Sequence, residues 1–452
     1  MKRVLVANRG EIAVRVIRAC HELGLEAVAV YSTADREGSW VRLADRSVCI
    51  GPPAARDSYL NQSNVVGAAE TTGCDAIHPG YGFLSENPSF VRTCEDNDLI
   101  FVGPTPESME VLGDKSLAKG AMRDAGMPLV PGSDGRLASV EDARRVASEV
   151  GYPVLLKAAS GCGGRGMRPV SEPSELESAY ATATAEAEAA FGDGGLYLEK
   201  IVLDAHHIEV QVVGDGDGGA LVVGERECSV QRRHQKLLEE SPSPFIGEET
   251  RQQLYAAALG AVRATRYRNA GTIECLLGGD QSFYFMEMNT RLQVEHPVSE
   301  EVSGIDLVRT QLRLAMGEPL PAEGIAPTHG HAIEFRINAE DPSRGFMPSP
   351  GPLLRFRPPL GRGVRVDTHA YEGYTVPPSY DSLVAKLIVS DDSRVLALGR
   401  AAQALREFEV EGISTTLPLF REMVASEPAF RAGMYTTAYL EEAAGRLSSL
   451  SL

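Results

Sequence analysis

The chain has 452 residues, of which 43% are hydrophobic and 23% charged, the balance of a globular protein with roughly two to four domains. Its net charge of −18 argues against a nucleic-acid partner, because phosphate binding needs a positive field. The absence of any run of about 18 apolar residues argues against a membrane span, and seven scattered cysteines without a CxxC pair favour the cytoplasm over a disulfide framework or a zinc site.

Residues 1–113 alternate apolar strands with amphipathic helices, the rhythm of a parallel sheet. The predicted strands are Arg3–Ala7, Glu26–Tyr31, Asp75–His78 and Leu99–Val102. A helix from Glu11 carries Ile12, Val16, Ile17, Cys20 and Leu23 on one side. The turn before it, Asn8–Glu11, lacks G-x-G-x-x-G, which disfavours a dinucleotide there.

The rest of the chain divides at proline- and glycine-rich stretches. Pro128 to Gly135 precede a smaller α/β segment that ends near Leu203. Residues 204–317 mix strands and helices, and a link from Gly317 to Pro327 leads to a last segment of short strands. The Ala- and Glu-rich stretch 176–190 is predicted to be a helix.

Residues 161–166 read Gly-Cys-Gly-Gly-Arg-Gly, a glycine pattern that is weak without its context. A predicted strand, Tyr152–Ala159, comes before it, and Gly166–Val170 reads as a strand, whereas a dinucleotide turn needs a helix. Such a hairpin can fold over phosphates, because glycines let backbone N–H groups approach anionic oxygens. Lys157 and Lys115 are candidate phosphate ligands. The alternatives are a plain flexible turn and, for Lys115, a surface lysine near a helix start.

Two strands, 272–277 and 283–289, are joined by a short polar turn and predict a hairpin. A turn centred near residues 280 and 281 places Glu274 opposite Glu287, with Cβ atoms about 5 Å apart. Two like charges there destabilise the sheet unless a divalent cation lies between them. Together with the Asn289 amide oxygen, the glutamates are ligands suited to Mg²⁺. The alternative is a purely structural pair with one glutamate in solvent.

Polar residues continue at odd positions beyond this hairpin: Glu287, Asn289, Arg291, Gln293 and Glu295. A strand has a period of two, so the pattern predicts that all five side chains face the same way. We interpret this face as the floor of an active site, with an exposed polar face as the alternative.

Several long motifs in this order resemble the biotin carboxylases, which belong to the ATP-grasp superfamily. They are Asn8–Ala13, His78–Asn87, Gly161–Arg168, Cys228–Lys236, Glu274 with Glu287, Asn289–Pro297 and Glu334–Pro342. The resemblance runs from about residue 3 to about residue 441. It implies a mixed α/β and α+β fold with a parallel-sheet N-terminal domain (1–113), a central ATP-grasp domain (114–320) with a mobile lid at about 131–203, and a mixed C-terminal domain (328–445).

The resemblance also implies roles for individual residues. ATP is assigned to Lys115, Lys157, Gly163, Gly164, Glu199, Lys200, His207, Gln231, His234, Glu274 and Glu287. Bicarbonate is assigned to Lys236, Arg291, Gln293, Val294 and Glu295. Biotin is assigned to Tyr81 and Arg336, and the metal, Mg²⁺ or Mn²⁺, to Glu274, Glu287 and Asn289. The catalytic set is Glu295, Arg291, Arg336 and Lys236.

The activity implied by the resemblance is the ATP- and bicarbonate-dependent carboxylation of biotin through carboxyphosphate. We expect the first half-reaction in the carboxylation of acetyl-CoA or a related acyl-CoA, with pyruvate carboxylation as an alternative. The expected partners are a separate biotin carboxyl carrier protein, since the sequence has no Ala-Met-Lys-Met-like segment, and a carboxyltransferase subunit. A homodimer is also implied, with Arg18 and Glu22 as contacts.

Two cysteines set limits on this interpretation. Cys162 interrupts a loop that is commonly an almost unbroken glycine run in the family, which raises a question about lid dynamics more than about activity. Cys228 lies eight residues before Lys236 and is interpreted as a buried structural cysteine instead of a catalytic thiol.

Two other functions compete with this one. The first is another ligase of the same fold, forming carbamoyl phosphate or carboxylating a purine precursor. The second is a silent ATP-binding scaffold. The presence of the whole set of motifs from Tyr81 to Arg336 disfavours the first, and the intact Lys236, Arg291, Glu295 and Arg336 disfavour the second.

Overall fold

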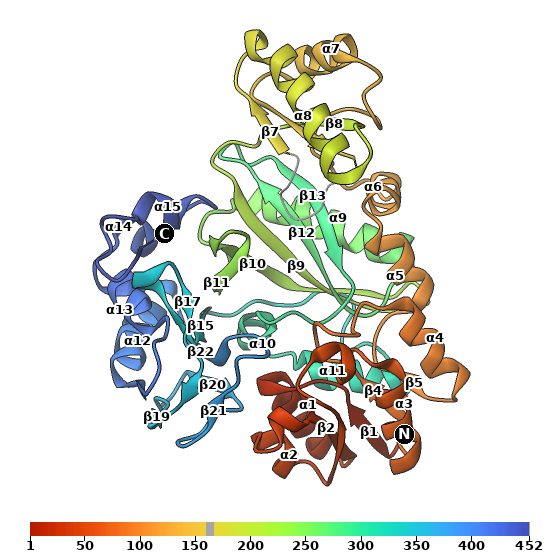
Figure 1. The fold of residues 1–452 in the computed structure, drawn as a ribbon, viewed down its shortest axis with the longest axis vertical. Helices are drawn as coiled ribbons and strands as arrows, with labels where there is room; N and C mark the ends of the chain where they lie inside the picture. The colour runs from red at the N-terminus through yellow and green to blue at the C-terminus, as the bar shows by residue number, and fades with distance from the viewer. Residues whose placement is uncertain (160–166, 452) are drawn as a thin grey trace. The chain divides into compact units, whose positions relative to one another are not determined.

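The structure is a computed structural model that describes residues 1–159 and 167–451 (Figure 1). The chain forms two compact units, one of residues 1–127, 206–275 and 287–452, the other of residues 128–205 and 276–286. Cys162, Gly163 and Gly164, named above from the sequence, lie outside the described residues, and so does the side chain of Lys115.

The first unit begins with a five-stranded sheet in the order β3-β2-β1-β4-β5. Its strands are β1 (Arg3–Val6), β2 (Glu26–Ser32), β3 (Arg46–Gly51), β4 (Ala76–His78) and β5 (Ile100–Phe101). All neighbouring strands are parallel, which confirms the predicted parallel sheet. Strand β3 was not predicted, because this edge strand buries only Ile50 and so shows no alternation of apolar residues.

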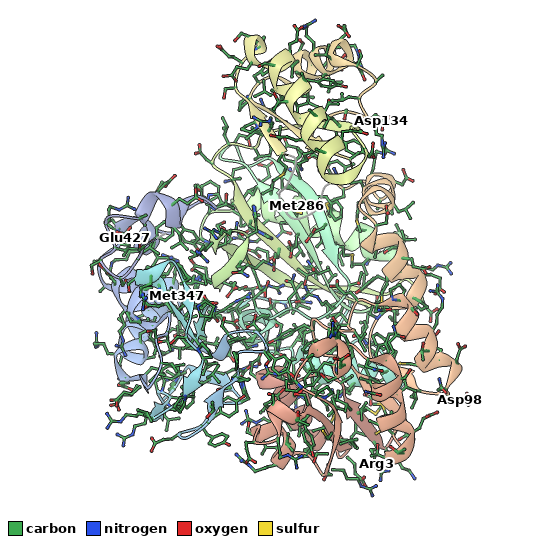
Figure 2. The ribbon with its side chains drawn as sticks, viewed as in Figure 1. Arg3, Asp98, Asp134, Met286, Met347 and Glu427 are labelled. Carbon is green, nitrogen blue, oxygen red and sulfur yellow. The ribbon has the colours of Figure 1, made fainter. Side chains whose placement is uncertain are left out.

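Helices connect these strands and follow the last of them. They are α1 (Gly10–Glu22), α2 (Ser39–Leu43), α3 (Gln62–Thr72), α4 (Pro88–Asp96), α5 (Pro106–Gly113) and α6 (Lys115–Asp124). The side chains of Asn61, Asn87 and Thr105 accept hydrogen bonds from the first turns of α3, α4 and α5. At the start of β1, Arg3 (labelled in Figure 2) pairs with Glu26 on β2 at 2.6 Å between Nε and Oε2.

A larger, mostly antiparallel sheet joins the middle and the end of the chain in the order β13-β12-β9-β10-β11-β15-β22-β20, with β14 beside β10. Its strands are β9 (His206–Asp215), β10 (Ala220–Arg232), β11 (Gln235–Ser241), β12 (Arg268–Leu277), β13 (Phe283–Asn289), β14 (Gly324–Ile325), β15 (His331–Asn338), β20 (Val364–Thr368) and β22 (Leu383–Asp391). The sheet thus places residues of the Cys228–Lys236 and Glu334–Pro342 motifs on neighbouring strands.

Helices and short strands complete the first unit. The helices are α9 (Glu248–Ala264), α10 (His296–Ser303), α11 (Leu307–Ala315), α12 (Arg394–Glu407), α13 (Leu417–Ser426), α14 (Pro428–Ala432) and α15 (Tyr439–Ala443). Two-stranded pairs connect β16 (Glu340–Asp341) with β17 (Met347–Pro348), β18 (Gly351–Pro352) with β21 (Thr375–Val376), and β19 (Arg355–Arg357) with β23 (Glu409–Glu411). Phe335, Leu387 and Phe420 lie in a buried core that packs β15 and β22 against α12 and α13.

The second unit has a three-stranded antiparallel sheet in the order β7-β6-β8, covered by α7 (Val140–Val150) and α8 (Leu176–Phe191). Its strands are β6 (Val154–Ala158), β7 (Met167–Val170) and β8 (Leu196–Lys200). The pairing of β6 with β7 confirms that strands flank the glycine segment on both sides. The whole arrangement is the mixed α/β fold predicted from the sequence.

Candidate active site

A buried ammonium group lies at the centre of a cluster of carboxylates in the first unit. Lys236 on β11 places its Nζ 3.0 Å from Glu274 Oε1 and 2.8 Å from Glu295 Oε1, and it also contacts Glu209 Oε1. The Lys236 side chain is 12% exposed, and those of the three glutamates are between 0 and 6% exposed. Burial lowers the pKa of Lys236, but the three carboxylates outweigh it and raise that pKa well above its ordinary value.

Two more cations complete the charge balance of the cluster. His207 Nε2 lies 3.0 Å from Glu274 Oε2 and 3.3 Å from Glu209 Oε1, and Arg226 Nη2 donates to Glu209 Oε2 at 3.1 Å. Burial opposes protonation of the imidazole, but the two carboxylates raise the pKa of His207 to about 9. Burial likewise opposes ionisation of Glu209, yet Lys236 and its other partners lower its pKa to about 2. Buried carboxylates are stable only when paired in this way.

Glu295 is the N-cap residue of α10 and is held by a cation on each oxygen. Lys236 donates to Oε1, and Arg336 Nη2 donates to Oε2 at 2.8 Å. Burial raises the pKa of Glu295, but the cations outweigh it and leave that pKa below its ordinary value. The carboxylate is therefore ionised at neutral pH, a condition for accepting a proton. Arg336, on β15, also pairs with the buried Glu239.

The segment after β13 departs from the predicted strand. The strand ends at Asn289, and residues 290–295 leave the edge of the sheet, where His296 N donates to Gln293 O and Val298 N to Glu295 O at the start of α10. These backbone groups are used by the turn and the helix and cannot also form a ladder. The expectation of one continuous face from Glu287 to Glu295 was therefore wrong.

Polar side chains of this segment nevertheless converge on Glu274. Asn289 Nδ2 and Gln293 Nε2 donate to Glu274 Oε1 at 2.7 and 2.8 Å, and Arg291 Nη2 donates to Asn289 Oδ1 at 3.1 Å. Burial opposes ionisation of Glu274, but Lys236 and His207 hold its pKa well below the ordinary value.

Glu86 positions Arg291 and was not singled out from the sequence. Its Oε2 accepts from Arg291 Nε at 2.8 Å, and its Oε1 accepts from Thr290 N at 3.1 Å. Glu86 lies inside the His78–Asn87 motif, and that membership was the signal available in the sequence.

Tyr81, also in that motif, is held from α1 and from the first loop. Its hydroxyl donates to Glu11 Oε1, and Asn8 Nδ2 donates to the backbone oxygens of Pro79 and Tyr81 at 2.6 and 2.7 Å. Glu11 in turn lies 3.1 Å from Lys386 Nζ on β22. Lys386 was not predicted, because a lone lysine in an apolar strand belongs to no motif.

The turn between β10 and β11 carries two residues assigned to ATP by resemblance. Gln231 is opposite Lys236 in the antiparallel register of the two strands. His234 is exposed at the tip, where it and Arg233 have positive φ values of 66° and 48°. A left-handed conformation at two successive non-glycine residues makes this a sharply bent hairpin end.

In the second unit, Lys157 on β6 and Glu199 on β8 form an ion pair. Lys200 Nζ donates to the backbone oxygens of Gly151 and Tyr152 at 2.8 and 2.7 Å. The cation of Lys157 thus lies on the strand that leads into residues 160–166, where the sequence analysis expected it.

The donor set proposed for a metal has the right chemistry for Mg²⁺. Glu274 and Glu287 supply carboxylate oxygens on the neighbouring strands β12 and β13, and Asn289 supplies an amide oxygen at the end of β13. Glu274 is buried and ionised, whereas Glu287 is exposed. In this structure Asn289 directs its amide nitrogen toward Glu274.

Cys228 adjoins the carboxylate cluster, with its Sγ within 4.8 Å of ligand atoms of Glu209 and Glu295. It is fully buried, and burial together with Glu209 raises the pKa of its thiol well above the ordinary value. A neutral thiol is a poor nucleophile, which supports the structural interpretation of this cysteine.

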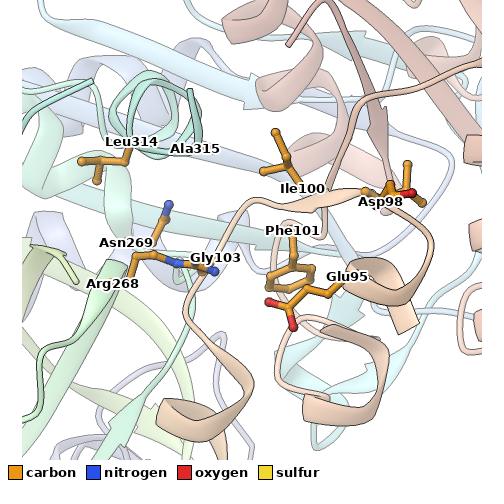
Figure 3. A pocket seen from close by; sticks show the side chains of 10 residues that line it. Glu95, Asp98, Ile100, Phe101, Gly103, Arg268, Asn269, Leu314 and Ala315 are labelled. Atoms are coloured by element: carbon orange, nitrogen blue, oxygen red, sulfur yellow. The ribbon is translucent and has the colours of Figure 1, made fainter. Parts of the chain in front are cut away.

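A separate pocket of about 330 Å³ lies between α4, β5, β12 and α11 (Figure 3). Glu95, Asp98 and Phe101 line it together with Arg268 and Asn269. Arg268 Nε donates to Gly103 O at 3.1 Å, so its guanidinium braces the wall of the pocket. The residues assigned to substrates from the sequence do not line it.

Among the described residues, no helix has the length and apolar character that a membrane crossing requires.

Comparison with known proteins identifies the family over nearly the whole chain. Residues 1–109 match the biotin carboxylase N-terminal domain, residues 114–323 the ATP-binding domain of the carbamoyl-phosphate synthase L chain, and residues 334–442 the biotin carboxylase C-terminal domain. The biotin carboxylase of Pseudomonas aeruginosa is 52% identical over 447 residues, which cover 98% of this chain and 99% of that protein.

Solved structures agree with the sequence comparison. The biotin carboxylase of Campylobacter jejuni, in complex with a β,γ-ATP ligand, has a TM-score of 0.90 and 49% identity and covers 98% of each chain. The biotin carboxylase domain dimer of the Hydrogenobacter thermophilus 2-oxoglutarate carboxylase, in complex with MgADP, ADP and bicarbonate, has a TM-score of 0.89 and 46% identity, covering 100% of this chain and 99% of that one. The chain thus belongs to the biotin carboxylase family of ATP-dependent ligases.

Proposed function

We propose that this biotin carboxylase uses ATP and bicarbonate to carboxylate biotin on a separate carrier protein, through carboxyphosphate, as the first half-reaction of acetyl-CoA carboxylation. The observation that carries the proposal is the position of Glu295, an ionised buried carboxylate held between Lys236 and Arg336. A carboxyltransferase subunit completes the reaction, and the chain acts in the cytoplasm as a homodimer. Membership of the family and a relative that is a dimer support these finer assignments.

ATP is assigned by resemblance to Lys115, Lys157, Glu199, Lys200, His207, Gln231, His234 and the acidic pair Glu274 and Glu287. Bound Mg²⁺ would neutralise charge on the terminal phosphates as the γ-phosphoryl group is transferred. Glu274 and Glu287 with Asn289 would hold it. Manganese can take the same oxygen ligands.

Bicarbonate is assigned to Lys236, Arg291, Gln293, Val294 and Glu295. Arg291 can bind a planar oxyanion through two parallel N–H donors, which fixes its approach. Lys236 and Arg336 mask the Glu295 carboxylate and keep its pKa low. When these cations turn toward an anionic substrate, Glu295 becomes a stronger base and takes the bicarbonate proton.

The activated intermediate then reacts with biotin. The deprotonated bicarbonate oxygen attacks the γ-phosphorus, ADP leaves, and the carboxyphosphate formed breaks down to CO₂ and phosphate. The phosphate takes the proton from the ureido nitrogen of biotin, and this nitrogen attacks CO₂. Arg336 stabilises the negative ureido oxygen, and Tyr81 contributes to the biotin site.

The test incubates the purified chain with ATP, Mg²⁺ and labelled bicarbonate, and adds free biotin or a biotinylated carrier. A tethered biotin gains from a high effective concentration, so label is expected on the carrier at far lower concentration than on free biotin. Label fixed to this chain without any carrier would refute the separate carrier. Addition of a carboxyltransferase with acetyl-CoA, pyruvate or 2-oxoglutarate then identifies the final acceptor, and transfer to a keto acid alone would refute the acetyl-CoA assignment.

A further inference from the structure

A fully buried lysine lies between the two sides of the site that are assigned to biotin and to bicarbonate. Lys386 on β22 has a side chain with 0% exposure. Its Nζ donates to Val294 O at 2.9 Å and lies 3.1 Å from Glu11 Oε1. Glu11 Oε1 also accepts the hydroxyl hydrogen of Tyr81. One chain of contacts therefore runs from Tyr81 through Glu11 and Lys386 to Val294.

The position of the ammonium is fixed by the sheet. Lys386 is opposite Arg336 on β15 and opposite Asp367 on β20, so all three side chains are on one face of neighbouring strands. Asp367 Oδ2 lies 4.0 Å from Nζ and is itself paired with Arg365 at 2.8 Å. Lys386 thus has a preferred direction, toward Glu11 and the Val294 carbonyl.

The contact with Val294 has a consequence for the proposed base. The peptide between Val294 and Glu295 is planar, so a fixed carbonyl also fixes the N–H of Glu295 and the direction in which its Cα leaves. Glu295 begins α10, and its carboxylate must meet Lys236 and Arg336. A buried ammonium that holds this carbonyl therefore positions the carboxylate without touching it.

We propose that Lys386 is a positioning residue that, with Glu11 as its partner, sets the placement of Tyr81 relative to the Val294–Glu295 peptide and so couples ATP use to biotin carboxylation. The inference rests on the proposed function, since it concerns the same two substrates. It assigns a role to a charge pair that binds neither of them.

Removing the pair is expected to reduce the rate of biotin carboxylation strongly. Misplacement of a reacting group by about 1 Å can reduce a rate roughly 10²-fold. Lys386→Met keeps an unbranched side chain, shorter by one heavy atom, but leaves Glu11 buried without its cation, so this variant is also expected to lose stability. The double variant Glu11→Gln/Lys386→Met removes both charges together and is expected to recover much of that stability. The double variant thus separates a loss of positioning from a loss of stability.

The experiment measures biotin carboxylated per ATP consumed, the KM values for ATP and bicarbonate, and the thermal midpoint, for the wild type, both variants and Lys2→Met, an exposed-lysine control. We expect the double variant to keep the wild-type KM for ATP, to raise the KM for bicarbonate, and to carboxylate about 10²-fold less biotin per ATP. The control should match the wild type in every measurement.

A double variant with the wild-type ratio of carboxylated biotin to ATP overturns the proposal, whatever its stability. A ratio that is unchanged while all rates fall together also overturns it, because that pattern indicates a purely structural pair. The wild-type arm alone reports on the proposed function: a wild type that neither consumes ATP nor labels biotin refutes that function, and the role of Lys386 with it.

Discussion

Glu295 has both oxygens in contact with cations, and this pairing explains how a deeply buried carboxylate stays ionised. Glu295→Gln keeps the size of the side chain but removes its ability to accept a proton. We expect turnover to fall by roughly 10²–10⁴-fold, with the Kd for ATP unchanged. Steady-state kinetics and nucleotide titration test this expectation, and near-normal turnover would contradict the assignment of the base.

Glu287 is exposed on β13, next to strand β12, which carries the buried and ionised Glu274. Glu287 is proposed to ligate Mg²⁺. Glu287→Gln removes one anionic ligand, so the Mg²⁺ concentration for half-maximal activity should rise and turnover should fall. Glu249→Gln, an exposed position in the first turn of α9, is the matched control and should leave the titration unchanged. If Glu287→Gln also leaves it unchanged, Glu287 is structural.

The residues that the sequence identified were those inside long motifs. Lys236 and Glu295 do meet in space, and Arg291 is linked to them through Asn289 and Glu274. Glu86 lies in a motif although it was given no role. Glu209 and Arg226 were not predicted, because charged residues in otherwise apolar strands usually indicate a solvent-facing side. In the structure both sheet faces are buried there, and the two side chains pair with each other inside.

Among the elements, β11 is fixed to the C-terminal part of the chain by one buried carboxylate. Glu240 accepts from His331 at 2.5 Å, from Arg394 Nε at 2.7 Å and from Tyr435 at 2.5 Å. Burial opposes its ionisation, but these partners, led by His331, lower the pKa of Glu240 to about 2. The pKa is lower in the folded state than in the unfolded state. The contribution to stability is therefore complete at neutral pH and is lost as the pH falls toward 2.

This pH dependence can be measured as a difference between two proteins. Glu240→Gln cannot ionise, so the gap in unfolding free energy between wild type and variant should narrow as the pH is lowered from 7. The full contribution is roughly 3 kcal/mol, of which about 1 kcal/mol is lost by pH 4. Urea titrations at pH 7, 5 and 4 test this, with Glu70→Gln on the exposed side of α3 as control. A constant gap would contradict the role of Glu240.

Element prediction succeeded for strands that follow apolar runs of the sequence and failed for one edge strand. β1, β2, β4 and β6 follow the apolar runs of the sequence, whereas β3 buries only one residue and was missed. The polar alternation after β13 resembled a strand, but the backbone there is used by Glu86 and by the start of α10. Such competition from distant groups is not visible in a local pattern.

For the whole molecule, the chain passes between its two units more than once. Residues 276–286 belong to the unit otherwise formed by residues 128–205. The turn in that return segment was predicted from its glycines and polar residues, and its closure by Gly278 N and Ser282 O agrees. Which of the two units this turn belongs to depends on tertiary packing, so no local sequence pattern predicts its membership.

Arg18 and Glu22 are both exposed on α1, which fits the expectation that they contact a second copy of the chain. Arg18→Glu should weaken the dimer by like-charge repulsion, so light scattering at micromolar concentration should show a mass shift from two chains toward one. Arg56→Glu, at a side chain that is 85% exposed, is the control and should leave the mass unchanged. A wild type that is monomeric under these conditions would contradict the dimer itself.

The loop that carries Tyr81 and Glu86 connects the biotin side of the proposed site with its bicarbonate side. Tyr81 at its start is held by Asn8 and Glu11, and Glu86 near its end holds Arg291. The number of residues between Tyr81 and Glu86 therefore sets how far the biotin side lies from the bicarbonate side. Substitutions at positions 82–85 change packing but keep that length. An insertion or deletion there would shift one contact relative to the other, so relatives with the same activity should differ there in residue type and never in loop length.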